Sequence, residues 1–387
     1  MKNMKEGWVV KKLGEVCESD LGKTLNQSID TGELYPYLCA VNIQWDRIDF
    51  STLKKTRFEE SELERYYVRK GDLLICEGGD IGRSAIWDKD EPMLYQNALH
   101  RVRFNGEVLP RFCLFYLKHL KDSGVLDSRY GKGVTIKHLV KSSLLSIPIP
   151  IPPLSLQSRI VSELDGINSI IEKKREQLKQ LDALAQSIFY DMFGDPIQNE
   201  KGWEVKKLGE VAPAKEYKGE IPNRDGKYWL LNLDMVVAHS GEVLEQCFFE
   251  PSEIGNSTIT FNQDNVLYSK LRPYLNKVVV PDGIGYATSE LVPLYPDKQY
   301  LDRIYLAQML RSSSFVEFIS AKVAGAKMPR VSMNDFRTFP IPLPPLSLQQ
   351  AFAAKIEAIE KQKELIKQSI AEVETLLASR MQFYFDA

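Results

Sequence analysis

Two segments of this chain occur twice. The stretch GWVVKKLGEV at residues 7–16 returns as GWEVKKLGEV at residues 202–211, and IPIPIPPLSLQ at residues 147–157 returns as FPIPLPPLSLQ at residues 339–349. The first pair is offset by 195 residues and the second by 192, so the copies keep their order and nearly their spacing. A repeat of this length indicates two homologous halves that are built on a common framework.

Between the shared segments the two halves diverge. This is the pattern expected if the framework is common and each half carries its own recognition surface, while plain sequence drift is the alternative. Each globular part has the short strands of a mixed α+β domain, for example a turn followed by a strand at residues 68–76 and the matching place at residues 262–269. Apolar stretches at residues 112–117 and 305–310 are expected to form helices in the core.

A long helical pattern follows each proline-rich run. Prolines fix an extended, polyproline-like segment without backbone donors, so a helix can begin only after it. Apolar residues then recur at alternating spacings of four and three, which is the pattern of a coiled-coil seam. The seam positions are Ile160, Leu164, Ile167, Ile171, Leu178, Leu181 and Ile188 in the first helix, and Ile356, Ile359, Ile366, Ile370, Val373 and Leu377 in the second.

Neither seam can stay exposed to water, because such a stripe is a large apolar patch. We therefore expect the two helices to bury each other, in antiparallel orientation because the halves are pseudo-symmetric. The first helix is expected to end at Gly194, which suits a left-handed C-terminal cap, and Pro196 prevents its continuation. About 40 residues at about 1.5 Å per residue give a rod near 60 Å. The alternative is that each helix packs on its own globular half.

These patterns predict an α+β fold in which two pseudo-symmetric globular domains are separated by a long antiparallel two-helix coiled coil. The expected division is 1–153 for the first recognition domain, 154–193 for the first spacer helix, 194–201 for a linker, 202–345 for the second recognition domain and 346–387 for the second spacer helix.

The charge balance makes any nucleic-acid surface a local one. The 50 Lys and Arg residues nearly cancel the 52 Asp and Glu residues, so the whole molecule lacks the strong positive field of many DNA-binding proteins. Phosphates are bound by Lys, Arg or free backbone N–H groups, and each half offers them in one loop after a strand and one before the proline run. The candidate DNA-binding residues are Arg83, Arg129, Lys132, Lys137, Lys270, Arg272, Lys322, Lys327 and Arg330. Solvated surface charge would explain any single loop, whereas recurrence at matching places favours binding.

No catalytic or metal-binding motif is complete in the sequence. Gly22-Lys23-Thr24 resembles the end of a phosphate-binding loop, but the first glycine that such a loop needs would lie at Cys17. The five cysteines have no paired spacing and the four histidines have no ligand spacing, so we expect no metal site. The catalytic steps that this chain enables are therefore expected on partner proteins.

The sequence also gives no sign of a membrane partner. No stretch approaches the roughly 18 apolar residues of a membrane span, and the first residues lack the apolar run of a secretory signal. We expect a cytoplasmic protein.

Taken together, the motifs resemble one family. The GWxxKKLGEV segments, the variable regions, the PxPxPPLxLQ runs and a helix ending in MFGDP at residues 192–196 are similar, over essentially the whole chain, to the specificity subunits of type I restriction-modification systems. The stretch YSKLRPYLNK at residues 268–277 also resembles segments of their target recognition domains, whereas the first-half loop departs from it. The resemblance implies two target recognition domains, each reading one half of a bipartite, asymmetric double-stranded DNA sequence.

The resemblance also implies partners. In that family, two methyltransferase (modification) subunits carry S-adenosylmethionine and methylate adenine, and a restriction subunit hydrolyses ATP, translocates and cuts DNA. The chain would then be a non-catalytic subunit without a cofactor, with S-adenosylmethionine, ATP and Mg²⁺ expected on the partners only. A coiled-coil adaptor whose two heads bind proteins is the alternative, followed by a nuclease fused to its own reader.

Overall fold

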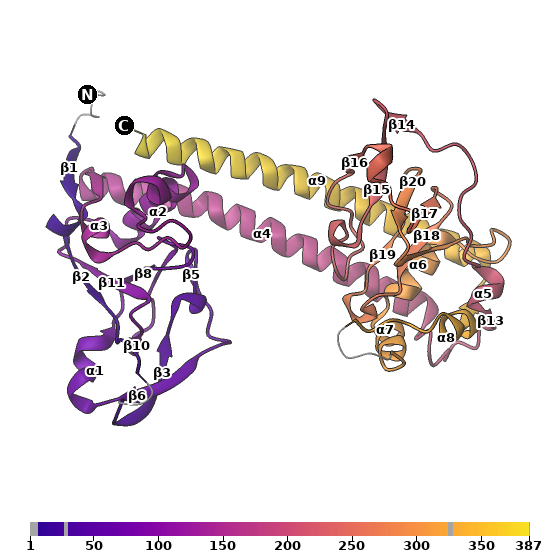
Figure 1. Cartoon of the computed structure of the whole chain (residues 1–387), viewed down its shortest axis with the longest axis horizontal. Coiled ribbons are helices and arrows are strands. Elements are labelled where there is room, and N and C mark those ends of the chain that lie inside the picture. Colours follow the sequence, from indigo (N-terminus) through magenta and orange to yellow (C-terminus); the bar gives the residue numbers. More distant parts are fainter. Residues whose placement is uncertain (1–6, 27–29, 324–327, 387) are drawn as a thin grey trace. The chain divides into compact units, whose positions relative to one another are not determined.

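The computed structural model describes residues 7–26, 30–323 and 328–386, which form two compact units (Figure 1). Unit 1 contains the described residues of 1–174 and 368–387, and unit 2 contains those of 175–367. Each unit therefore combines one globular half with parts of both long helices. The C-terminal end of the chain folds with the N-terminal half.

Unit 1 contains two four-stranded sheets, with the strand orders β6-β3-β10-β7 and β2-β11-β8-β9. Its elements are β1 (Val9–Lys12), β2 (Cys17–Leu21), β3 (Glu33–Leu38), β4 (Ile43–Gln44), β5 (Arg47–Ile48), β6 (Lys54–Phe58), α1 (Glu60–Tyr66), β7 (Tyr67–Val68), β8 (Leu73–Cys76), β9 (Ser84–Ile86), β10 (Met93–Tyr95), β11 (Leu99–Phe104), α2 (Pro110–Asp122), α3 (Lys141–Leu145) and β12 (Pro148–Ile151). The apolar stretch 112–117, predicted to form a core helix, lies in α2 and is buried along its whole length.

Unit 2 contains a sheet of order β14-β15-β20-β17, with β16 also paired to β15, and a sheet of order β19-β18-β21. Its elements are β13 (Glu204–Lys207), α5 (Leu208–Val211), β14 (Asn223–Arg224), β15 (Lys227–Leu231), β16 (Phe248–Phe249), β17 (Thr258–Phe261), β18 (Val266–Ser269), β19 (Val278–Val279), β20 (Gly285–Thr288), β21 (Leu291–Leu294), α6 (Arg303–Arg311), α7 (Ser313–Ser320), α8 (Met333–Thr338) and β22 (Pro340–Leu343). The second predicted core helix is α6, and its apolar face is buried.

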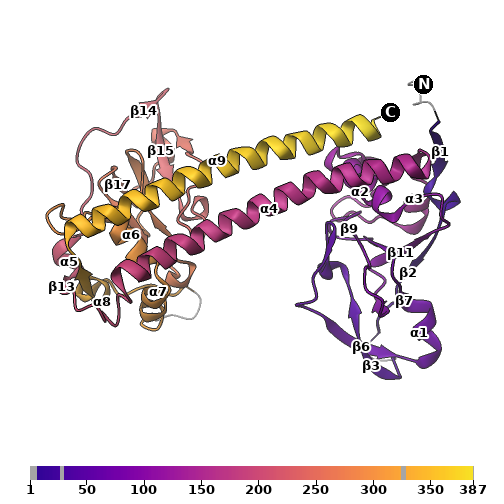
Figure 2. The ribbon, with the colours of Figure 1, turned by 180° about the vertical axis from the view of Figure 1, so that it is seen from behind.

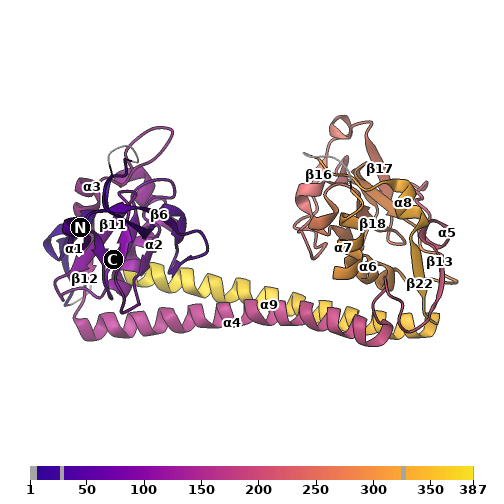
Figure 3. The ribbon, with the colours of Figure 1, turned by 90° about the horizontal axis from the view of Figure 1, so that it is seen from below.

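The two repeated motifs pair with each other in each half. β1 lies antiparallel to β12, with Lys12 opposite Pro148. β13 lies antiparallel to β22, with Lys207 opposite Pro340 (Figure 3). Both runs are extended and each long helix begins after its run, as expected, but Pro148–Ile151 and Pro340–Leu343 are paired strands and not isolated polyproline-like segments. Pro148 and Pro150, like Pro340 and Pro342, occupy alternate positions, so their missing N–H groups fall on the side away from the single partner strand.

The last residue of each proline-rich motif is a buried glutamine that joins the helix start to the globular half. The Oε1 atom of Gln157 accepts a hydrogen bond from the backbone N–H of Leu109 at 2.8 Å. Its Nε2 atom donates to the backbone oxygens of Glu107 and Pro152 at 2.8 and 2.9 Å. The corresponding three bonds in unit 2 join Gln349 to Asp302 N, Tyr300 O and Pro344 O.

Two 40-residue helices, α4 (Leu154–Phe193) and α9 (Leu346–Phe385), follow the two proline runs. In unit 1 the start of α4 packs beside the end of α9, and in unit 2 the end of α4 packs beside the start of α9 (Figures 1 and 2). The pairing is antiparallel, which confirms the predicted fold class.

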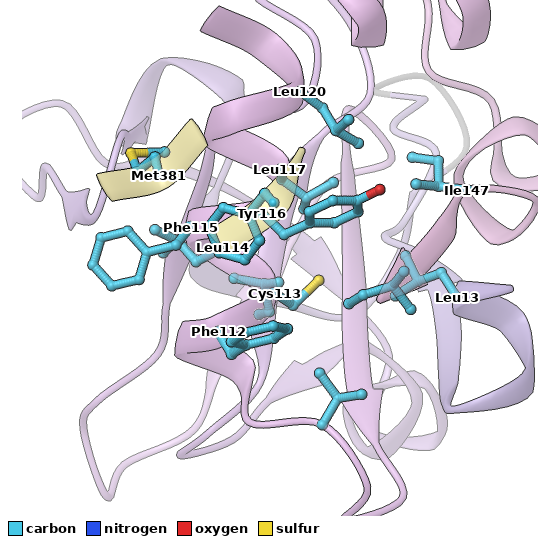
Figure 4. Close-up of a cluster of buried hydrophobic side chains, with 14 of the residues drawn as sticks. Leu13, Phe112, Cys113, Leu114, Phe115, Tyr116, Leu117, Leu120, Ile147 and Met381 are labelled. Atoms are coloured by element: carbon cyan, nitrogen blue, oxygen red, sulfur yellow. The ribbon is translucent and has the colours of Figure 1, made fainter. Parts of the chain in front are cut away.

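The C-terminal part of α9 belongs to the core of the N-terminal half. Leu377, Met381 and Phe385 are buried in the same cluster as Phe112 of α2, and Figure 4 shows Met381 near the apolar face of that helix. The alternative in which each long helix packs only on its own half is therefore wrong.

Polar contacts join the two helices as well. In unit 1, Glu163 of α4 accepts hydrogen bonds from Arg380 and Tyr384 of α9, the latter at 2.7 Å. In unit 2, the buried Nζ atom of Lys363 lies 2.7 Å from an Oδ1 atom of Asp182. The fully buried seam residues are Ile160, Leu164, Ile167, Ile171, Ile356, Ile359 and Leu377. The half-buried ones are Leu178, Leu181, Ile188, Ile366, Ile370 and Val373.

The end of α4 follows the expected cap geometry. Gly194 has a φ of +73° and its N–H donates to the backbone oxygen of Tyr190 at 2.8 Å. A left-handed residue directly after the helix satisfies one of the last helical carbonyls, and glycine adopts this conformation without a Cβ clash. The prediction of a glycine cap at this position is confirmed.

Candidate nucleic-acid interface

In unit 1 the structure brings the two predicted loops together. The loop after β8 and the loop before the proline run are joined by a hydrogen bond from the backbone N–H of Leu139 to the oxygen of Glu77, at 2.7 Å. Gly78 and His138 form an antiparallel bridge beside it, and His138 Nδ1 lies 3.0 Å from Glu77 Oε2. Two segments about 60 residues apart in the sequence therefore form one surface.

In unit 2 the equivalent loops meet in the same way. The backbone N–H of Val331 donates to the oxygen of Lys270 at 2.9 Å, and that of Arg272 donates to Pro329 at 2.8 Å. Leu271 and Arg330 form the antiparallel bridge. Glu77 and Lys270 are the first residues after β8 and β18, so the repeated framework makes the same junction twice.

The first-half loop presents two of its three predicted cations on a closed hairpin. Lys132 and His138 exchange two backbone hydrogen bonds of 2.8 Å each, which fixes the base of the hairpin. Arg129 and Lys132 are exposed, and Lys137 is half-buried. Lys132 and Lys137 therefore stand on the hairpin, Arg129 stands in the helical turn Leu126–Tyr130 just before it, and the three can approach a polyanion together.

Arg83, the fourth predicted cation of the first half, is turned into the protein. Its Nη2 atom donates to the backbone oxygen of Ala40 at 2.7 Å. Its Nε atom is buried and has no hydrogen-bond partner among the described residues. Arg83 thus holds the loop after β8 against the β4 region, and the contacts of its guanidinium are inside the protein.

The predicted cations of the second half differ in their availability. Arg272 is exposed and has a φ of +50°, and Lys270 is half-buried. Lys322 is exposed, with its Nζ atom 4.2 Å from the centre of the Phe318 ring. Lys327 lies outside the residues that the structure describes.

Arg330 is held by an acidic partner. Its Nη2 and Nε atoms lie 2.8 and 3.2 Å from the two carboxylate oxygens of Glu290. The hydrogen bonds from Arg330, followed by the charge of Lys270, hold the pKa of Glu290 below its usual value. Glu290 was not predicted from the sequence, because it lies 40 positions from Arg330 and no local spacing links them.

A cavity of about 740 Å³ lies in unit 2. Its lining combines acids and bases, including Lys363, which forms ion pairs with both Asp182 and Glu360. Burial lowers the pKa of Arg311, another lining residue, to about 10. Asn276, in the loop after β18, also lines the cavity, but none of the predicted cations that the structure describes does, so the cavity adds nothing to their chemistry.

Two general features of the described residues bear on the type of protein. No group of three or more His, Cys, Asp or Glu side chains in the described ranges could hold a metal ion. No helix in that part of the chain is both long enough and apolar enough to span a membrane.

Comparison with known proteins gives a consistent result. Residues 5–181 and 200–375 each match the family described as type I restriction modification DNA specificity domain. The chain is 24% identical to the type I restriction enzyme MjaVIII specificity subunit of Methanocaldococcus jannaschii, over 96% of this chain and 92% of that one. It is 20% identical to the EcoDI specificity subunit of Escherichia coli, over 94% of this chain and 83% of the relative.

Solved structures share the fold. A chain from a study of complex assembly and conformational transition of the type I R-M system aligns over 100% of this chain and 99% of its own, with a TM-score of 0.61 and 18% identity. The S subunit of a type I system from M. genitalium aligns over 99% and 96%, with a TM-score of 0.52 and 13% identity. With both halves matched, the chain belongs to the type I restriction modification DNA specificity domain family and carries that domain twice.

Proposed function

We propose that this chain is the DNA-reading subunit of a type I restriction-modification complex. Its two domains each read one half of a bipartite, asymmetric sequence, and the chain directs methyltransferase and restriction subunits to that sequence. Catalysis and the cofactors S-adenosylmethionine, ATP and Mg²⁺ belong to those partners. The relatives that cover most of this chain are named specificity subunits, which supports the assignment.

The observation that carries the proposal is the repeated junction of two loops. The Leu139–Glu77 bond in unit 1 and the Val331–Lys270 bond in unit 2 join equivalent segments, while the loop sequences around them differ. Two domains that read two different half-sites need the same framework with different side chains at equivalent positions, and the two units have this arrangement. Phosphate contacts from exposed cations fix the position on DNA, and base contacts then set the sequence.

Selection from a random duplex library tests this function. The chain, assembled with methyltransferase subunits, is incubated with the library, and the bound duplexes are sequenced. We expect two short conserved blocks that differ from each other and are separated by a fixed number of unspecified base pairs. Recovery of a single block, or of no preferred sequence, would contradict the proposal.

Replacing Lys132 by Ala should weaken binding to every duplex to a similar extent. A lysine that neutralises one phosphate releases about one counterion, so its loss reduces the slope of log affinity against log salt by about 0.9 and lowers affinity about fivefold near 0.1 M salt. Fluorescence anisotropy titrations at several salt concentrations measure both quantities. Lys179→Ala on α4, at a side chain that is 77% exposed, is the matched control and should leave the slope unchanged. An unchanged slope for Lys132→Ala would remove Lys132 from the interface.

Replacing Glu290 by Gln should strengthen sequence-independent binding. The carboxylate of Glu290 neutralises Arg330 and lies beside Lys270, so its removal leaves both cations free to attract phosphate. One unit charge at about 4 Å in water is worth about 1 kcal/mol, which corresponds to a gain of roughly two- to fivefold that shrinks as salt is added. Glu357→Gln, at an exposed position on α9, is the control. Equal affinities of both variants and the unaltered chain for an unrelated duplex would show that this loop does not face DNA.

A further inference from the structure

The tip of the first-half hairpin exposes two apolar side chains. Val134 is 98% exposed and Ile136 is 62% exposed, between the cations Lys132 and Lys137. We propose that Val134 and Ile136 form an apolar wedge that enters a groove of the first half-site, partly unstacks one base step and bends the duplex. This inference rests on the proposed function and names the part of the surface that deforms the DNA.

The hairpin presents this tip in a defined way. The paired backbone hydrogen bonds between Lys132 and His138 close its base, and the bridge between His138 and Gly78 ties it to the loop after β8. Gly133 has a φ of +104°, and a Cβ atom there would lie 2.3 Å from the backbone oxygen of Ile136. The turn is therefore tight enough to require glycine, and it directs the following residues outward as a unit.

The charge around the tip favours a nucleic acid as the occupant. No acidic residue occurs between Asp127 and Glu163 in the sequence. Lys132 is exposed at the base of the hairpin, Arg129 is exposed in the helical turn just before it, and the nearby carboxylate of Glu77 is engaged by His138 at 3.0 Å. Cations on both sides of exposed apolar side chains are complementary to a DNA duplex, which has phosphates on its outside and stacked apolar bases inside. Minor-groove proteins use apolar wedges in this way. The free-energy cost of unstacking the base step is offset by the additional contacts that the bent DNA makes with the protein.

Exposed aliphatic residues are common on protein surfaces and need no explanation one at a time. Here two β-branched residues lie at the tip of a closed hairpin. The hairpin belongs to the surface that we propose to contact DNA because of its cations and its junction with the loop after β8. Their χ1 angles are stiff, so little rotamer freedom is lost on insertion. In the second half, residues 324–327 lie outside the described part of the chain, so the wedge is assigned to the first half only.

The test uses the full chain assembled with methyltransferase subunits, together with the duplex that the unaltered protein selects. This duplex carries a dye at each end, which reports bending, and 2-aminopurine at successive half-site positions, which reports unstacking. The double variant V134S/I136S is compared with Leu34→Ser, at a 60% exposed position in β3. We expect the unaltered chain and Leu34→Ser to bend the duplex and to raise 2-aminopurine fluorescence at one step of one half-site. The double variant should lose both signals and about tenfold in affinity for the selected duplex, while the salt slope stays the same because the phosphate contacts remain.

Several outcomes would overturn the wedge. If the unaltered chain binds its selected duplex without bending it, or if V134S/I136S bends it equally, the wedge is wrong and the proposed function stands. If the double variant binds DNA normally but no longer co-purifies with the methyltransferase subunits, the tip is a protein contact. If the unaltered chain selects no duplex at all, the proposed function and the wedge both fail.

Discussion

Replacing Gln157 by Leu is expected to destabilise unit 1 by about 3–5 kcal/mol. The side chain is fully buried and satisfies one backbone N–H group and two backbone carbonyls, at Leu109, Glu107 and Pro152. Leucine can replace none of these bonds, and each buried polar group left without a partner costs about 1–3 kcal/mol. Urea-induced unfolding followed by circular dichroism measures the loss as a lower midpoint.

The chain provides both a matched repeat and a matched control for this substitution. Gln349→Leu removes the corresponding three bonds in unit 2 and should cost a similar amount. Gln177→Leu makes the same chemical change at an exposed position of α4 and should shift stability by less than about 0.5 kcal/mol. If Gln157→Leu were as mild as Gln177→Leu, the glutamine would not be what anchors the helix start.

The duplication and the long helices could be predicted from sequence because each is a pattern that recurs along the chain. Repeated motifs are visible without any structure, and a seam such as Ile160, Leu164, Ile167 and Ile171 follows from helix geometry alone. The glycine cap at Gly194 was predictable for a different reason, because a helix cap depends only on neighbouring residues.

The pairing of the two repeated motifs could not be predicted in this way. Lys12 and Pro148 lie 136 positions apart, and nothing in either segment encodes the other as its partner. A proline run is compatible both with an isolated extended segment and with an edge strand. Only the tertiary fold, which brings β1 to β12 and β13 to β22, decides between these states.

The candidate interface was predictable at the level of loops and less so at the level of side chains. The residue types in the loops that carry Lys132 and Lys270 identified these loops as candidates. In the structure, backbone hydrogen bonds join each of them to its partner loop. Long-range contacts decide which cation is available. Arg83 is bound to Ala40 and Arg330 to Glu290, and both partners are about 40 residues distant in the sequence.

Removing one heptad from each long helix is expected to shorten the unread gap in the DNA target by about three base pairs. Deletion of residues 172–178 from α4 and 366–372 from α9 removes about two turns from each helix and keeps the seam in phase, since the helices run antiparallel. Seven residues at about 1.5 Å each amount to about 10 Å, or about three base pairs at 3.4 Å. An insertion of one heptad at both places should lengthen the gap by the same amount.

We propose that α4 and α9 set the spacing between the two DNA-reading domains, and mapping of methylated adenines tests this proposal most directly. Genomic DNA modified by the unaltered complex, by the heptad deletion and by the heptad insertion is sequenced by a single-molecule method that detects the methyl groups. We predict the same two half-site sequences in all three samples, with gaps that differ in steps of about three base pairs. Identical gaps in all three samples, from complexes that remain folded and active, would contradict the claim.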